Sequence, residues 1–142
     1  MQSDILFYVN AESLLPVLAA GIAHLILGSA WYHPKVFGSA WMRLTNITPE
    51  IAERGGRRKP AYTFIAFLAG LIAAYILNLL SLAWGVFEVA GAMQLALLVW
   101  LGFIAPSMLG SFLWDHRPFS LLCINAGYWL VSLIVMALIL LV

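Results

Sequence analysis

Charged side chains are missing from four long stretches of this chain, and this limits its fold more than any other feature. No Asp, Glu, Lys or Arg occurs between Glu12 and Lys35, Lys59 and Glu88, Glu88 and Asp115, or Arg117 and the final Val142. Each stretch exceeds the roughly 20 apolar residues that cross a hydrocarbon core as a helix. A charge at the centre of such a helix costs about 2.5–3.5 kcal/mol to insert. We predict helices at about 13–32, 61–83, 90–114 and 118–142.

The composition indicates lipid rather than water as the surroundings. The chain is 64% hydrophobic and 9% charged, whereas soluble proteins are about 45–50% apolar and about 25% charged. Runs such as 133–142 are continuously apolar, which excludes the alternating pattern of a transmembrane β-barrel. The fold class is therefore all-α, a bundle of four transmembrane helices in a single domain over residues 1–142. One cysteine, Cys123, allows neither an intrachain disulfide nor a CxxC zinc pattern.

The basic residues are placed on one side of this topology. Arg117 lies between the third and fourth predicted helices, and the other six lie between the first and second: Lys35, Arg43, Arg54, Arg57, Arg58 and Lys59. The positive-inside rule puts such loops in the cytoplasm. We predict a cytoplasmic loop at about 33–60, with both termini on the opposite side of the membrane.

This loop is long enough to contain its own helix. Thr48-Pro49 is a typical helix start and Gly55-Gly56 a typical stop, which predicts a short surface helix at about 48–54. The basic residues that follow should meet lipid headgroups; they are Arg54, Arg57, Arg58 and Lys59. One interpretation is a set of topology anchors that attract anionic lipid. The other is a specific site for a lipid or protein partner.

Small residues at four-residue spacing indicate how the helices pack, because close packing replaces hydrophobic burial as the driving force in lipid. We expect three such stripes to face the bundle interior, although one of them could instead join two copies of the chain. They are Ala20, His24 and Gly28; Ala66, Gly70 and Ala74; and Gly102, Pro106 and Gly110. Pro106 should also kink the third helix.

Three polar side chains lie at a similar depth on three helices. His24, Ser107 and Asn125 are each seven residues inside the predicted basic end of their helix, about 10 Å at helical rise. We predict that they converge into one buried polar layer. Such groups either join helices by hydrogen bonds or line a polar cavity for a small solute. A metal site is not expected, since one His with two neutral groups is a poor ligand set.

A second polar cluster is expected where the helices meet the cytoplasm. It consists of Trp31, Tyr32, His33, Asp115, His116 and Arg117. Asp115 could pair with Arg117 or His33, or it could lie at the start of the fourth helix, where the helix dipole favours a carboxylate. The simpler interpretation is a polar tight turn between helices.

The segment that follows the first helix carries a family resemblance. It reads Trp31-Tyr32-His33-Pro34-Lys35-Val36-Phe37-Gly38-Ser39-Ala40-Trp41, with weaker matching elements at Leu101-Gly102-Phe103, Asp115-His116-Arg117-Pro118 and Asn125-Ala126-Gly127-Tyr128. It resembles the signature of bacterial integral membrane proteins grouped as domain of unknown function 1761. The resemblance implies a four-helix fold in a bacterial inner membrane, with no assigned activity and with variation at His33. The segment itself could be a structural cap or a lid over a cytoplasm-facing cavity.

Two classes of function fit these observations. The function we predict from the sequence is the first, a small structural or accessory membrane protein that acts through the bilayer or through protein partners, including a second copy. The second is a small solute transporter or channel that uses His24, similar in size to the small multidrug antiporters but without their membrane-embedded Glu. We predict no enzyme activity and no cofactor, because paired carboxylates, a phosphate loop and an activated nucleophile are all missing. The net charge of +1 indicates no nucleic-acid partner.

Overall fold

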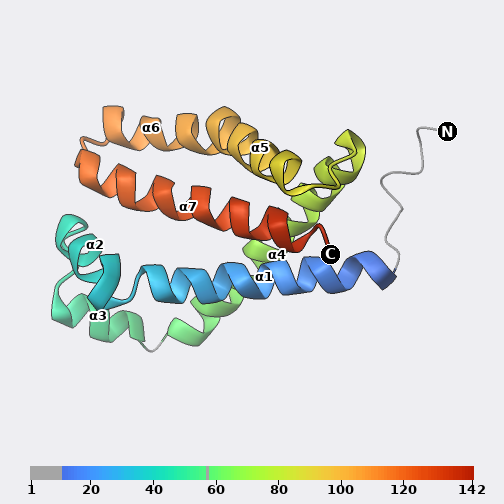
Figure 1. Ribbon diagram of the computed structural model, residues 1–142. Helices are drawn as coiled ribbons and strands as arrows, with labels where there is room; N and C mark the ends of the chain where they lie inside the picture. The colour runs from blue at the N-terminus through green and yellow to red at the C-terminus, as the bar shows by residue number, and fades with distance from the viewer. Residues whose placement is uncertain (1–10, 57) are drawn as a thin grey trace.

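The computed structural model describes residues 11–56 and 58–142, and four long helical spans dominate it (Figure 1). They are α1 (Ala11–Trp31), α4 (Lys59–Trp84), the continuous α5 (Val89–Val99), η3 (Trp100–Ile104) and α6 (Ala105–Trp114), and α7 (Phe119–Ile139). Three short elements join α1 to α4: η2 (Pro34–Gly38), α2 (Ser39–Leu44) and α3 (Pro49–Gly56).

The four predicted transmembrane helices are confirmed. All four spans are long and apolar enough to cross a membrane, and their ends lie within three residues of the predicted ones. The short loop helix is also present as α3, whose first turn is capped by the Thr48 hydroxyl accepting from the Ile51 amide (3.4 Å). The Thr48 side chain also lowers the pKa of Glu50, since its hydrogen bond favours the ionised carboxylate.

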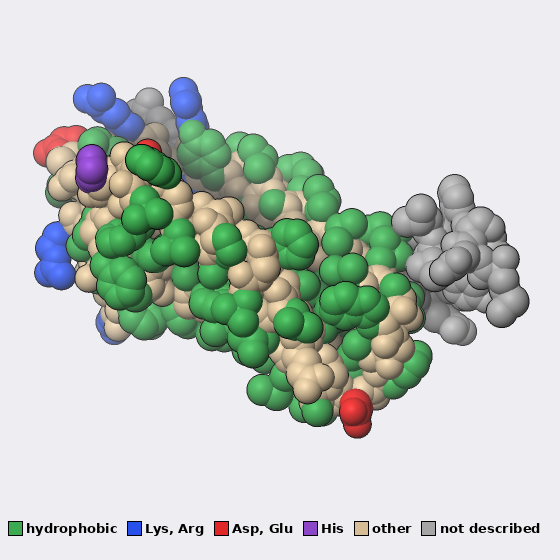
Figure 2. All heavy atoms as spheres, turned by 90° about the horizontal axis from the view of Figure 1, so that it is seen from above, with side chains coloured by type: hydrophobic (Ala, Val, Ile, Leu, Met, Phe, Trp, Pro, Cys, Tyr) green, Lys and Arg blue, Asp and Glu red, His purple; other side chains and the backbone are tan. Residues whose placement is uncertain are grey.

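The helices lie along a common direction, with α7 between α1 and the α5–α6 span in the view of Figure 1. The most extensive contacts join α1 to α4, α1 to α7 and α5 to α7. We call the end that carries α2, α3 and the α6–α7 turn the basic end, because Lys and Arg side chains gather there (Figure 2). The opposite end, where α1 begins and α7 finishes, is the terminal end. On the face seen in Figure 2, many hydrophobic side chains lie at the surface between the two ends.

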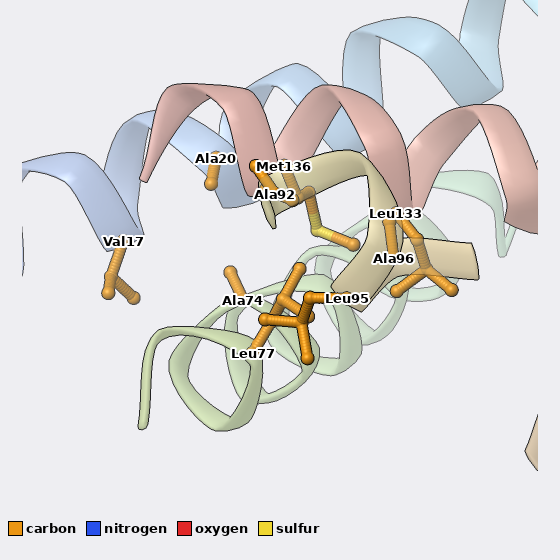
Figure 3. Packing of buried hydrophobic residues seen from close by; sticks show 10 residues of the cluster. Val17, Ala20, Ala74, Leu77, Ala92, Leu95, Ala96, Leu133 and Met136 are labelled. Atoms are coloured by element: carbon orange, nitrogen blue, oxygen red, sulfur yellow. The ribbon is translucent and has the colours of Figure 1, made fainter. Parts of the chain in front are cut away.

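The buried apolar core lies in the terminal half of the bundle (Figure 3). Small side chains form much of it, and Ala20, Ala74 and Ala96 are fully buried where the helices approach each other. Larger side chains fill the remaining space: Val17, Leu77, Leu95, Leu133 and Met136. This is the packing expected for helices that must associate in lipid.

Two of the three predicted small-residue stripes face inward. On α1 and α4, Gly70 lies against the His24 ring, where an added Cβ would come within 2.6 Å of Cδ2. The prediction for the third stripe is wrong, since Pro106 is exposed and a Cβ on Gly102 or Gly110 would meet nothing within 4 Å. The reason is that Trp100 and Ile104 pack toward the core from the opposite face of this span.

The third span changes its helical winding just before Pro106. Residues 100–104 form a single π turn, η3, between α5 and α6. A proline lacks the amide hydrogen that would continue the α-helical pattern, and a π turn is one way to accommodate the freed carbonyl group. Trp100 is the first residue of this turn, and its indole Nε1–H donates to the Ala126 carbonyl oxygen on α7 (2.8 Å).

The contact at Gly70 should be sensitive to side-chain size. Gly70→Leu is expected to lower the free energy of unfolding by about 1–3 kcal/mol, because overpacking displaces the His24 ring. Gly102→Leu is the control, at a glycine with open space around it, and should change stability by less than about 0.5 kcal/mol. Thermal unfolding in detergent measures both, and equal effects would contradict the packing described.

Candidate functional site

An open pocket of about 680 Å³ occupies the basic half of the bundle, between α1, α4 and α7. His24, Tyr128 and Trp129 line its deep end, and α3 lies across its mouth with Gly55 and Gly56. The α4 wall runs from Lys59 to Ala69, which corresponds to about 15 Å along a helix and about half the hydrocarbon thickness.

The pocket exists because small residues line the helices at this level. Gly28 on α1 and Ala66 and Ala69 on α4 face it, so small side chains leave space between these helices. Toward the terminal end, Gly70 of α4 lies against the His24 ring of α1, and this contact closes the pocket. The pocket is therefore open at the basic end and closed toward the apolar core.

His24 connects α1 to α7 at the floor of the pocket. It is only 5% exposed, and its Nδ1 lies 2.5 Å from the Ser132 hydroxyl oxygen. The Tyr128 hydroxyl lies 3.1 Å from Nε2 and donates to the backbone carbonyl of His24 (3.2 Å). Both ring nitrogens therefore have partners within the bundle. The ring also lies 5.3 Å from that of Trp129, measured between centroids.

The Trp-Tyr pair at the end of α1 makes a second connection to α7. The Trp31 indole donates to the Ile124 carbonyl oxygen (3.1 Å), and the Tyr32 hydroxyl donates to the Asn125 side-chain oxygen (3.0 Å). The Tyr32 ring packs against that of Tyr128 with 5.3 Å between centroids. Tyr32 also lines the pocket, so this pair ties the helices together beside the opening.

The glycine of the same motif has a steric role. Gly38 is buried, and a Cβ there would overlap the carbonyl groups of Tyr32 and His33. Its amide donates to the His33 carbonyl oxygen (3.0 Å), which closes the turn after α1. This geometry favours the interpretation of the motif as a structural cap.

The structure does not bring the three residues of the predicted polar layer together. Ser107 is exposed and donates to the Ile104 carbonyl oxygen of its own span (2.9 Å). Asn125 is half-buried and accepts from Tyr32, whereas His24 pairs with Ser132 and Tyr128. Equal depth did not imply a shared face, because Trp100 and Ile104 of this span pack toward the core while Ser107 faces outward.

The second predicted polar cluster, at the end of α1 and in the α6–α7 turn, is also not brought together. Trp31 and Tyr32 bind α7, but His33 is exposed and its Nδ1 accepts from the Lys35 amide (3.2 Å). The remaining three, Asp115, His116 and Arg117, are exposed in the α6–α7 turn, and none of them lines the pocket. His116 adopts a positive φ of 52°, as residues of tight turns do.

Three of the four basic residues predicted to meet headgroups lie within the described part of the chain. Lys59 lines the mouth itself. Arg54 and Arg58 line a separate hollow together with Glu50 and Glu53. Arg57 lies outside the described residues. Within the described ranges no group of three His, Cys, Asp or Glu side chains is arranged to hold a metal ion.

Sequence reasoning missed the α7 partners of His24. Tyr128 and Ser132 are four residues apart, so they share one face of α7, and Ile124 extends that face by another turn. A search for polar side chains at this spacing would have found them. Their separation from His24 by more than 100 residues hid the pairing.

A bundle of four helices long and apolar enough to cross a membrane, with an aromatic-lined pocket among its described residues, defines the class of protein. Residues 15–141 match the family model described as a protein of unknown function (DUF1761), and the chain belongs to this family. Comparison with curated proteins and with solved structures found no match. The resemblance carried by the Trp-Tyr motif is thus confirmed at the level of the family.

The hydroxyl of Tyr128 should matter less for stability than its ring. Tyr128→Phe is expected to cost about 0.6 kcal/mol, the average worth of a hydrogen bond between membrane helices. Tyr128→Ala should cost about 3–5 kcal/mol, because it also removes a buried ring that packs on His24 and Tyr32. Chemical or thermal unfolding in one detergent compares the two, and a Phe variant as unstable as the Ala variant would contradict this division.

Proposed function

We propose that this protein binds a small solute in the pocket at its basic end and acts as a small-solute carrier. The observation that supports it is the pocket itself. Its volume of about 680 Å³ lies in the range of small-molecule sites, which are mostly apolar with a few placed polar groups. The wall contains both, with aromatic rings at several levels and polar groups at the floor and the mouth.

The lining suggests the chemistry of the solute. Tyr32, Tyr62 and Trp129 supply aromatic surface, and Ser29 and Thr63 supply hydroxyl groups. Lys59 is the charged residue at the mouth, and none of the described lining residues is acidic. A neutral or anionic molecule with an apolar or aromatic body is therefore favoured over a cation.

The closed floor favours a carrier over an open channel. A channel needs a continuous polar path, whereas the terminal half is filled by the apolar core around Leu77, Leu95 and Met136. Passage of a solute would require α1 and α4 to separate near Gly21 and Gly70, where they now approach closely.

The basic end is proposed to face the cytoplasm of a bacterial cell, with the protein in the inner membrane. Support comes from Lys and Arg side chains that gather at this end of the molecule (Figure 2) and from the positive-inside rule. The pocket would then open toward the cytoplasm, and both termini would lie on the opposite side.

A structural role remains the second candidate, because His24 makes its hydrogen bonds within the bundle and leaves no ring nitrogen free for a ligand. The two proposals differ in whether water and solutes reach the pocket wall. A purely structural bundle would fill this space with lipid tails and would exclude charged reagents.

The accessibility of one α4 position to water distinguishes solute binding from a structural role. Ala69→Cys, in a Cys123→Ala background, should react with a water-soluble charged maleimide at least about ten times faster than Leu68→Cys. Ala69 lines the pocket, whereas neighbouring Leu68 is exposed on the outer surface of the bundle and should be covered by lipid. Thiols in hydrocarbon do not form the reactive thiolate. Equally slow reaction at both sites in reconstituted vesicles would contradict solute binding and favour the structural role.

A further inference from the structure

A second hollow lies on the outer side of α4, next to the pocket mouth. We call it the α4 groove; it has a volume of about 640 Å³ and is lined by Leu25, Gly56, Lys59, Pro60, Thr63, Phe64 and Phe67. Phe64 is 61% exposed, so the groove lies on the surface that faces lipid in a membrane-crossing helix. No part of the solute proposal uses Phe64 or Phe67.

The groove has the length and polarity of part of a lipid molecule. From Lys59 to Phe67 the α4 backbone rises about 12 Å, slightly less than one leaflet of a hydrocarbon core about 30 Å thick. Pro60, Phe64, Phe67 and Leu25 give it an apolar wall. Lys59 supplies a cation at the membrane-surface end, at the start of α4.

The charge at this end is not balanced within the groove. None of its described lining residues is acidic. Arg54 and Arg58 differ in this respect, since their hollow also contains Glu50 and Glu53. An unbalanced lysine beside an apolar groove attracts a negatively charged headgroup. Near a membrane surface, the attraction to anionic lipid is about 1 kcal/mol per basic residue.

We propose that an anionic phospholipid of the leaflet at the basic end occupies the α4 groove. Its phosphate contacts Lys59, and one acyl chain packs along Phe64 and Phe67. Because the groove and the pocket share Leu25, Gly56, Lys59 and Thr63, the bound lipid forms one side of the pocket mouth. Both proposals use Lys59, but solute binding concerns the inner wall of the pocket and lipid binding the outer side of α4.

Native mass spectrometry of the full chain with phosphatidylglycerol and phosphatidylcholine of matched acyl chains tests this site. The parent protein should retain phosphatidylglycerol with about five-fold preference, and Lys59→Gln should reduce that preference to about one. Lys35→Gln removes one charge from the same loop, at an exposed residue outside the groove, and should leave the preference unchanged. Phe64→Ala should weaken retention of both lipids alike.

Three results would overturn the proposal. One is equal retention of the two lipids by the parent. Another is an equal effect of Lys35→Gln and Lys59→Gln, which would indicate general attraction by the loop charge. The third is full retention after Phe64→Ala. Each leaves the thiol reactivity at Ala69 unaffected, so failure of the lipid site and failure of the solute pocket are distinguishable.

Discussion

The pairing of His24 with α7 is the interaction on which the remaining packing depends. A polar group in lipid has no water to bind, so an unpaired imidazole inside a span would be costly. Ser132 and Tyr128 satisfy both ring nitrogens and thereby fix the register of α1 against α7. The same ring lies against Gly70, which lets α4 approach, so three of the four spans meet at one side chain.

This junction divides the bundle into two halves with different properties. Toward the terminal end, alanine and leucine side chains pack into the apolar core shown in Figure 3. Toward the basic end the helices are lined by glycine, alanine and aromatic residues and leave the pocket open. Trp31 and Tyr32 hold α1 to α7 beside this opening, so the pocket keeps its shape without a filled core. The proposed binding of a solute and of a lipid both follow from the open half.

Periodicity and charge placement were sufficient to predict the fold. Charge-free windows located all four spans, because the cost of burying charge in lipid acts on each helix separately. The α1 and α4 stripes were also predicted, since small residues are needed wherever two membrane helices come close. Thr48, Pro49 and the glycine pair located α3 for local reasons of capping.

The site was predicted only in part, because it depends on which face each helix turns to its neighbours. His24 was identified from its rarity as an ionisable residue in a span. Its partners on α7 were not, and Ser107 was assigned to it on depth alone. The position of a residue along a helix gives its depth in the membrane. The rotation of the helix about its axis depends on which bulky residues pack against the core, and in this span they are Trp100 and Ile104. That information is tertiary and does not appear in the local sequence.

A double-mutant cycle between His24 and Ser132 tests the central claim most directly. The variants His24→Ala, Ser132→Ala and the double variant are compared by unfolding in one detergent, with His24 and Ser107 as the control pair. The hydrogen bond predicts a coupling free energy of about 0.6 kcal/mol or more for the first pair and none for the second. Additive effects for His24 and Ser132, or coupling between His24 and Ser107, would contradict the junction described for this bundle.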